Sequence, residues 1–249
     1  MKYIVMPFKF LWVIWGLIVF MSIISLITPI YLLLILIFGK KVKYTLVQCN
    51  YHVIAPYLLA MTLIFRKYHN REAMPDTGAS VLISNHQSMS DIIINAAASK
   101  QGGFFLSKKS MTKFPVFGLM IKALGILVDR NNEESRKKSY LYMVKTIKED
   151  QHPIFIYPEG TRNRTDQPLK EFYDGAFRLA LETGVPIIAQ TLVGAQQIYH
   201  PNHPLQLQPG LVHVYFDKID TTKYAKDEVK KLKEDVKQIM WNRIVNHPK

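Results

Sequence analysis

The fold of this chain is constrained most by an N-terminal stretch without charged residues, which runs from Phe10 to Gly39. As one continuous α-helix this stretch would be about 45 Å long, whereas the hydrocarbon core of a bilayer is roughly 30 Å thick. A segment of this length and apolarity is typical of a membrane anchor. We therefore expect the N-terminal part of the chain to insert into a lipid bilayer.

Pro29 is expected to interrupt this helix, because proline removes a backbone donor and clashes with the preceding turn. Two arrangements follow: residues 10–28 span the bilayer, or residues 10–28 and 30–38 form a bent hairpin that enters one leaflet. Lysines flank the stretch at both ends, which favours the hairpin with both ends in the cytoplasm. The stretch is too long for a cleaved signal peptide, and no small-residue cleavage pattern follows it.

A second uncharged stretch, residues 44–65, is less apolar and contains a proline, so it predicts an interfacial helix rather than a second span. Pro75-Asp76-Thr77-Gly78 then reads as the turn that opens a globular domain. We accordingly assign residues 1–72 to membrane-anchoring and interfacial helices, and residues 73–249 to a globular domain.

The chain has 249 residues and a net charge of +13. Such a charge fits nucleic acid, an anionic membrane or an anionic substrate. Nucleic acid is the weakest of these partners, because the basic residues are dispersed and no zinc-finger, basic-zipper or RNA-recognition pattern is present. A single cysteine, Cys49, excludes an internal disulfide and a cysteine-based zinc site.

Short apolar runs alternate with helical patterns in the globular part. The expected strands are residues 81–84, 104–106, 126–128, 154–157, 186–190 and 212–216, and the expected helices are residues 91–99, 115–124, 134–149 and 171–183. This alternation predicts an α/β fold, in which helices flank a mostly parallel central sheet. Gly184 is expected to cap the last of these helices. Apolar residues from Val229 to Met240 share one face of an amphipathic helix that ends the chain.

A candidate general base follows the first expected strand. Asp91 comes five residues after His86, in the first turn of the next helix. Helical side chains point back toward the N-terminus, so the Asp91 carboxylate can accept a hydrogen bond from one nitrogen of His86. That bond would fix the tautomer, leave the other nitrogen free to take a proton, and stabilise the imidazolium that forms.

The spacing alone is a weak signal, because a helix-capping charge and a polar loop histidine produce it as well. A metal site at His86 is less favoured, since no further histidine cluster supplies ligands. Ser88 is disfavoured as a nucleophile, because it lies outside any Gly-x-Ser-x-Gly elbow.

Cationic side chains end three of the expected strands. Lys108 and Lys109 end one strand, Arg130 follows another, and Arg162 lies just after the third. Ligands of α/β sheets bind at the carboxyl ends of the strands, and arginine offers a fork of donors suited to phosphate. Each cation alone is a common solvent-exposed charge, but three such sites on one edge indicate an anion-binding site.

Taken in order, four blocks resemble the glycerolipid acyltransferases, specifically the 1-acylglycerol-3-phosphate (lysophosphatidic acid) acyltransferases. The blocks are Asn85-His86-x4-Asp91, the stretch from Lys108 through Pro115 and Gly118 to Gly125 and Arg130, the loop Pro158-Glu159-Gly160-Thr161-Arg162, and, in part, Val185-Pro186-Ile187-Ile188. The resemblance covers residues 81–194, and the apolar N-terminus is similar to the family's membrane motif. The chain departs from the family's pattern at Ala189 and at Asp174, where a proline and a lysine are usual.

The resemblance implies that His86 is the general base and Asp91 its orienting partner. It implies that Lys108, Arg130, Glu159, Gly160, Thr161 and Arg162 hold the phosphate and glycerol end of the acceptor. The implied reaction is direct transfer of a fatty acyl group from acyl-CoA or acyl carrier protein to the hydroxyl of lysophosphatidic acid, with no cofactor and no metal. We expect backbone N–H groups at the start of the helix after His86 to stabilise the oxyanion.

Three alternatives remain open on the sequence. The same chemistry could act on another lysophospholipid, such as lysophosphatidylglycerol. A membrane-bound phosphoesterase would need a divalent metal. A non-catalytic lipid-binding membrane protein would not need His86, Asp91 and the Glu-Gly-Thr-Arg loop, all of which are intact.

Overall fold

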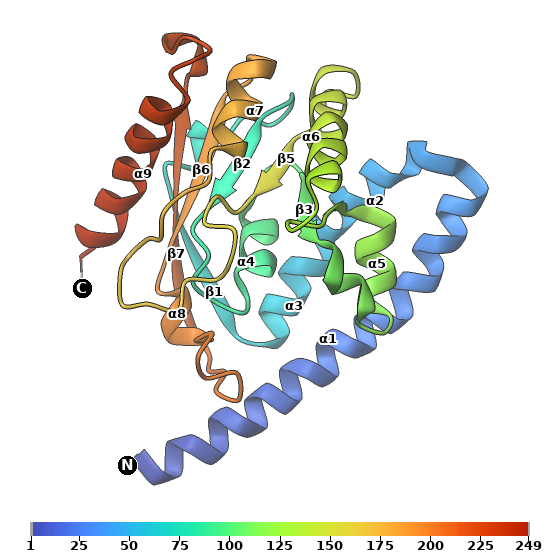
Figure 1. Cartoon of the computed structure of the whole chain (residues 1–249). Coiled ribbons are helices and arrows are strands. Elements are labelled where there is room, and N and C mark those ends of the chain that lie inside the picture. The colour runs from blue at the N-terminus through green and yellow to red at the C-terminus, as the bar shows by residue number, and fades with distance from the viewer. Residues whose placement is uncertain (1, 249) are drawn as a thin grey trace.

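The computed structural model describes residues 2–248 of the chain. It begins with a long helix, α1 (Lys2–Phe38), which a short 3-10 helix (Gly39–Val42) connects to a second helical arm. That arm consists of α2 (Lys43–Cys49), a π-helical turn (Asn50–Ile54) and α3 (Ala55–Met61). Gly39 adopts a φ of +67°, which permits the reversal between the arms. Figure 1 shows α1 as the outermost element on one side of the molecule, with α2 and α3 between it and the sheet.

The expected break at Pro29 does not occur, because α1 continues through this residue. The hairpin with arms 10–28 and 30–38 is therefore wrong, and the chain reverses at Gly39 instead. A proline inside a helix costs about 3 kcal/mol or more. Packing on both sides of the proline offsets this cost, since Ile24 is 1% exposed and Tyr31 is 5% exposed.

Helix α1 lies along the globular part rather than projecting from it. The indole N–H groups of Trp12 and Trp15 donate to backbone carbonyls at the end of α3, over 3.1 and 2.8 Å. Further along the helix, the rings of Phe20 and Phe117 meet edge to face with centroids 5.3 Å apart. The helix is thus attached to the domain at more than one point along its length.

The outward surface of α1 is apolar. Its exposed large hydrophobic side chains include Phe8, Leu11, Leu17, Ile18, Leu26, Leu33, Leu36, Ile37 and Phe38. Among the described residues, the helical stretch from Pro7 to Met61 is long and apolar enough to cross a membrane by length and composition. These two features support association of the N-terminal part with a membrane.

Within residues 2–248, seven strands form one sheet in the order β1-β7-β6-β2-β5-β3-β4. The strands are β1 (Ile64–His69), β2 (Val81–Ser84), β3 (Phe104–Lys108), β4 (Ile126–Val128), β5 (Ile154–Ile156), β6 (Ile187–Val193) and β7 (Gly210–Ile219). All neighbouring strands are parallel except β6 and β7, which are antiparallel. The sheet confirms the predicted α/β class.

The sheet begins earlier than the sequence indicates, since β1 precedes residue 73 and lies in the stretch assigned to interfacial helices. It is an edge strand, and its exposed side chains include Phe65. Edge strands lack the continuous apolar pattern of buried parallel strands, which explains why this one was missed.

Helices cover both faces of the sheet, because β2 and β5 are buried on both sides. The helices after α3 are α4 (Asp91–Ala98), α5 (Phe117–Leu124), α6 (Glu133–Lys148), α7 (Gly175–Thr183), α8 (Ala195–Ile198) and α9 (Val229–Val245). In Figure 1, α6, α7 and α9 form one layer, while α3 and α4 pack on each other in the other layer. The predicted cap at Gly184 is confirmed by a φ of +71°.

Helix α7 begins at Gly175 rather than at the predicted residue 171. The preceding residues are held in a non-helical segment by the neighbouring loop. The N–H of Lys170 donates to Glu159, and the N–H of Tyr173 donates to the carbonyl of Pro158. We call residues 168–173 the strap, because it ties α7 to the loop after β5.

Candidate active site

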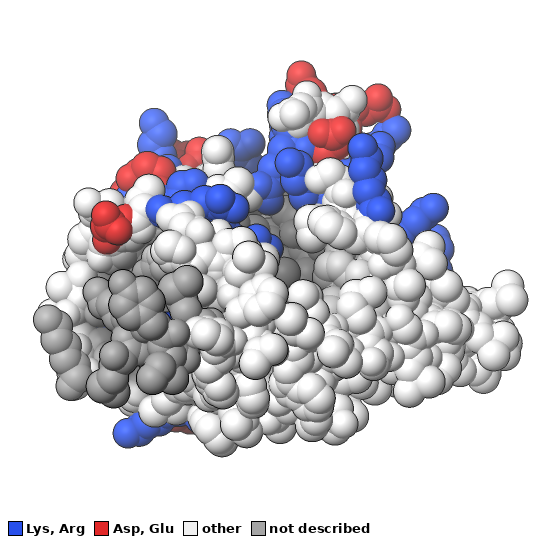
Figure 2. All heavy atoms as spheres, turned by 90° about the horizontal axis from the view of Figure 1, so that it is seen from below, with Lys and Arg blue, Asp and Glu red and all other residues white. Residues whose placement is uncertain are grey.

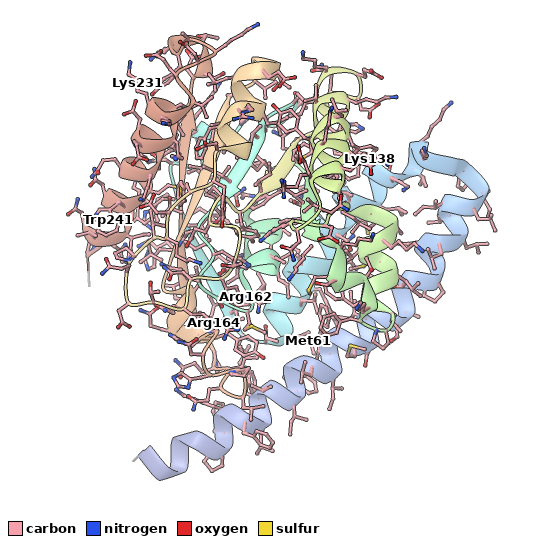
Figure 3. The ribbon with its side chains drawn as sticks, viewed as in Figure 1. Met61, Lys138, Arg162, Arg164, Lys231 and Trp241 are labelled. Atoms are coloured by element: carbon pink, nitrogen blue, oxygen red, sulfur yellow. The ribbon has the colours of Figure 1, made fainter. Side chains whose placement is uncertain are left out.

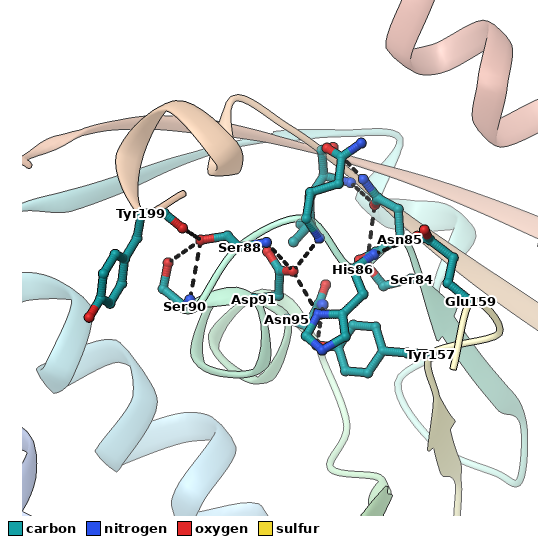
Figure 4. A network of polar contacts seen from close by, with 12 residues as sticks. Ser84, Asn85, His86, Ser88, Ser90, Asp91, Asn95, Tyr157, Glu159 and Tyr199 are labelled. Carbon is teal, nitrogen blue, oxygen red and sulfur yellow. Dashed lines mark hydrogen bonds and ion pairs between the residues drawn. The ribbon is translucent and has the colours of Figure 1, made fainter. Parts of the chain in front are cut away.

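His86 and Asp91 are brought together by the turn between β2 and α4. Oδ2 of Asp91 lies 2.8 Å from Nδ1 of His86, and it also accepts the N–H groups of Gln87 and Ser88, each over 2.7 Å (Figure 4). Asp91 is fully buried, at 0% exposure. One carboxylate oxygen therefore orders the whole turn and holds the imidazole by its Nδ1 atom. Nε2 is left as the nitrogen that can take a proton.

A tyrosine supports the face of the imidazole. The ring of Tyr157 stacks on His86 with centroids 4.1 Å apart and an angle of 20° between the planes (Figure 4). Its hydroxyl accepts a hydrogen bond of 2.9 Å from the Asn95 side chain. Burial raises the pKa of Tyr157 well above its ordinary value, so this residue stays a neutral phenol. The stacking and the Asp91 bond together fix both the plane and the tautomer of His86.

Asn85 explains how the chain turns out of the sheet at this point. Its Nδ2 donates to the carbonyl of Leu192 over 2.9 Å, and its Oδ1 accepts the Leu192 N–H over 2.8 Å. The side-chain amide thus replaces a backbone peptide in the pairing with β6. The backbone is free to leave the sheet, and His86 comes next.

The side chain of Glu159, in the loop after β5, is buried and does not line the cavity. It is 1% exposed, and its two oxygens accept the N–H of His86 over 2.7 Å and the N–H of Lys170 over 3.1 Å. The carbonyl of His86 in turn accepts the N–H of Asn163 over 2.5 Å. Burial raises the pKa of Glu159 to about 7. The structure thus gives Glu159 contacts with the backbone, instead of the exposed position that a ligand of the acceptor would need.

A cavity of about 1180 Å³ opens beside His86. One end is apolar and is lined by α1, α3 and α5, including Gly16, Phe20, Leu59, Phe117 and Met120. The other end is polar, and its cations are Lys108, Arg130, Arg162, Arg164 and Lys170. The described residues that line the cavity include no carboxylate. The cavity is therefore suited to a molecule with an apolar chain and an anionic head.

The molecular surface around the cavity is also divided into an apolar part and a cationic part. Figure 2 shows a broad uncharged face, with lysine and arginine side chains gathered along one border and around a hollow. Figure 3 labels Arg162 and Arg164 near Met61, which ends α3, and both arginines line the cavity together with residues of α3. The cations thus stand at the border between the apolar N-terminal helices and the charged remainder of the molecule.

Most of the residues expected to bind substrate line this polar end. Lys108 ends β3, Arg130 follows β4, and Gly160, Thr161 and Arg162 follow β5. Gly160 has a φ of +73°, and a Cβ there would lie 2.7 Å from the Tyr173 ring, so the turn requires glycine. Glu159 is the exception, as described above.

Other expectations from the sequence need correction. Three N–H groups of the turn between His86 and α4 are already paired, because Asp91 accepts those of Gln87 and Ser88 and the Tyr199 carbonyl accepts that of Met89, so the expected oxyanion contact would not come from these three. The Ser88 hydroxyl is fully buried and donates to the same carbonyl over 2.9 Å.

The position of Asp174 is also informative. Its carboxylate forms an ion pair of 2.9 Å with Lys233 on α9, and it does not line the cavity. Lys170 and Arg164, which belong to none of the four blocks, do line it. Sequence reasoning missed both residues, because a lysine or arginine in a polar loop gives no signal of its own.

The cavity therefore combines an oriented imidazole, apolar walls and a group of cations. The Acyltransferase family matches residues 65–193 of the chain. The 1-acyl-sn-glycerol-3-phosphate acyltransferase of Escherichia coli (strain K12) is 30% identical over 230 residues, which cover 88% of this chain and 91% of that protein. The protein of the same name from Salmonella typhimurium is 31% identical over 169 residues, 67% of each chain. This chain belongs to the acyltransferase family.

The fold has a counterpart among solved structures. The crystal structure of the 1-acyl-sn-glycerophosphate (LPA) acyltransferase PlsC from Thermotoga maritima matches with a TM-score of 0.80 at 17% sequence identity. The match covers 97% of this chain and 95% of that one, so it includes the N-terminal helices as well as the sheet.

Proposed function

We propose that this enzyme transfers a fatty acyl group from an acyl thioester to the free hydroxyl of lysophosphatidic acid, giving phosphatidic acid. The observation that carries the proposal is that His86 lines one cavity together with the apolar side chains of α1, α3 and α5 and with a group of cations. The names of the relatives agree with this substrate. The thioester is carried by coenzyme A or by acyl carrier protein, and the acceptor's phosphate occupies the cationic end.

In the proposed mechanism, Nε2 of His86 removes the proton of the acceptor hydroxyl as its oxygen attacks the thioester carbonyl. The tetrahedral intermediate collapses, the carbon–sulfur bond breaks, and the thiolate leaves with the electron pair. His86 then releases its proton to the thiolate or to solvent. Asp91 stabilises the imidazolium between these steps. General base catalysis of this kind contributes about 10² to 10⁴ in rate.

The proposed route needs no acyl-enzyme, and the structure supports it in one respect. Ser84 and Ser88, the hydroxyls nearest to His86 in the chain, are both buried and donate to the carbonyls of Asn85 and Tyr199. Sequential rather than ping-pong kinetics would be the kinetic counterpart of direct transfer.

We propose further that the enzyme lies on the cytoplasmic face of a membrane, with α1 inserted along its apolar surface. Two observations support this arrangement: α1 packs along the domain at Trp12, Trp15 and Phe20, and its other side exposes apolar residues. A helix attached in this way inserts as one wall of the cavity. Lipid substrates can then reach His86 from the bilayer without crossing water.

The test is acyl transfer by the purified protein in detergent, with labelled acyl-CoA or acyl carrier protein as donor and a panel of lysophospholipids as acceptors. Labelled phosphatidic acid from the wild type, and none from His86→Ala at equal folding, is the expected result. Transfer only to another lysolipid would support the acyl-transfer mechanism but show that the acceptor has a different headgroup. Transfer to none of the acceptors from either donor would refute the proposal and favour a lipid-binding protein.

A further inference from the structure

The side chain of Lys170 lies at the polar end of the cavity although it belongs to none of the blocks that the sequence singled out. Its Nζ donates to the Thr161 hydroxyl over 2.8 Å, in the loop that also carries Arg162. A hydroxyl is a neutral partner, so this bond does not compensate the positive charge of the ammonium and leaves its other N–H donors available. Lys170 therefore has the capacity to bind an anion in the cavity.

The backbone of Lys170 is fixed by its neighbours. Its N–H donates to Glu159 over 3.1 Å, and the side chains of Leu169 and Phe172 are each only 4% exposed. The strap is also bonded at Pro168, whose carbonyl accepts the side-chain amide of Gln87. A lysine anchored on both sides is placed more firmly than an ordinary lysine of a surface loop.

The buried carboxylate of Glu159 contacts the backbone of Lys170, whereas the next two acidic residues along the chain are paired with α9. Glu171 forms an ion pair with Lys237, and Asp174 forms one of 2.9 Å with Lys233, both on α9. Within residues 2–248, no carboxylate forms an ion pair with Lys170. Its charge is left to act on the cavity.

We propose that Lys170 is a specificity-determining residue that binds the acceptor's phosphate monoester, an inference that rests on the proposed function. A phosphate monoester carries about −1.5 to −2 charges near pH 7, whereas a phosphodiester carries about −1. Lys170, with Arg130 and Arg162, supplies the additional positive charge that distinguishes the two. Glu159 sets its distance from the base, because the same carboxylate holds the N–H groups of His86 and Lys170.

The experiment compares Lys170→Gln, Lys170→Arg and a control, Lys145→Gln, which removes one charge from an exposed side chain of α6. For lysophosphatidic acid we expect Lys170→Gln to raise KM about ten- to a hundredfold with a small change in kcat, since a hydrogen bond to a charged group is lost. For lysophosphatidylglycerol the change should be several times smaller, and Lys170→Arg should retain most of the affinity. Equal changes for the two acceptors, or an equal loss in Lys145→Gln, would overturn the proposal.

A binding measurement separates this proposal from the proposed function. Titration calorimetry of lysophosphatidic acid into His86→Ala, with and without Lys170→Gln, does not depend on catalysis. Binding that weakens with Lys170→Gln supports the phosphate role, even if the wild type transfers no acyl group. Unchanged binding in the double variant overturns it, even if the wild type proves to be an active acyltransferase.

Discussion

Replacing Asp91 by asparagine should slow catalysis strongly while leaving the fold nearly intact. Only Oδ2 of Asp91 accepts hydrogen bonds, from His86, Gln87 and Ser88, while Oδ1 is buried without a partner among the described residues. An amide oxygen in the place of Oδ2 can accept the same three bonds. The substitution therefore removes the negative charge and little else.

The loss can be estimated from the geometry. With Nδ1 and Oδ2 2.8 Å apart, the centres of the two charged groups are roughly 4 Å apart, which gives about 4 kcal/mol at an effective dielectric constant of about 20. The imidazolium is only partly formed in the transition state, so about 2 to 3 kcal/mol is lost there. This corresponds to a decrease in kcat of about a hundredfold.

The assay is initial-rate acyl transfer to lysophosphatidic acid, with thermal unfolding in the same detergent as the test of folding. Asp91→Ala is the matched comparison, because it also leaves the N–H groups of Gln87 and Ser88 without an acceptor and should lower the stability by about 2 to 4 kcal/mol. A kcat of Asp91→Asn within about threefold of the wild type would refute the electrostatic role of Asp91.

Four further predictions concern other parts of the site. The pKa of Glu159 is raised to about 7, so the folded state binds the proton of this carboxyl group more tightly than the unfolded state does. The wild type should therefore lose up to about 3 kcal/mol of stability as the pH rises from about 4.5 to about 7. Thermal unfolding of Glu159→Gln should not show this dependence on pH. Asn85→Ala leaves both backbone groups of Leu192 unpaired on the β2 side and should lower the unfolding free energy by about 2 to 5 kcal/mol in denaturant titrations; a loss below about 1 kcal/mol would contradict its role in the pairing. Gly160→Ala forces a side chain onto a φ of +73° and should cost about 1 to 2 kcal/mol in stability and raise KM for the acceptor; unchanged melting and kinetics would show that the turn relaxes. Ala55→Phe adds a ring at the apolar end of the cavity. It should reduce the transfer rate of the longest acyl chains about tenfold or more and leave the rate of short chains nearly unchanged. An equal effect on all chain lengths would count against binding of the acyl chain there.

The sequence predicted the sheet well, because parallel strands buried on both faces leave continuous apolar runs. The stretches around Val81 and Ile154 are of this kind, and both strands lie where expected. The sequence-based prediction missed β1, which is an edge strand with an exposed side. It also predicted a helix break at Pro29, where packing before and after the proline outweighs its local cost. Both failures have the same physical origin, since tertiary contacts override local preference.

For the candidate site, the sequence predicted which strand ends carry polar groups, but not which way the side chains face. The contact between His86 and Asp91 follows from the spacing and the direction of helical side chains. The burial of Glu159 does not, because its partners are backbone N–H groups that the sequence does not mark. The position of Lys170 could not be predicted from the sequence either, since it depends on the strap and on the pairing of Glu171 with α9.

The attachment of α1 has a consequence for work on this enzyme. Its inner side forms a wall of the cavity through residues such as Gly16 and Phe20, and its outer side exposes many large apolar side chains. A shortened protein that starts after Gly39 would lose the most exposed apolar helix, but it would also lose one wall of the cavity in which we propose that the acyl chain binds. For this chain, solubility and substrate binding place opposite demands on the same helix, so a soluble variant has to change the outer face of α1 while keeping the helix.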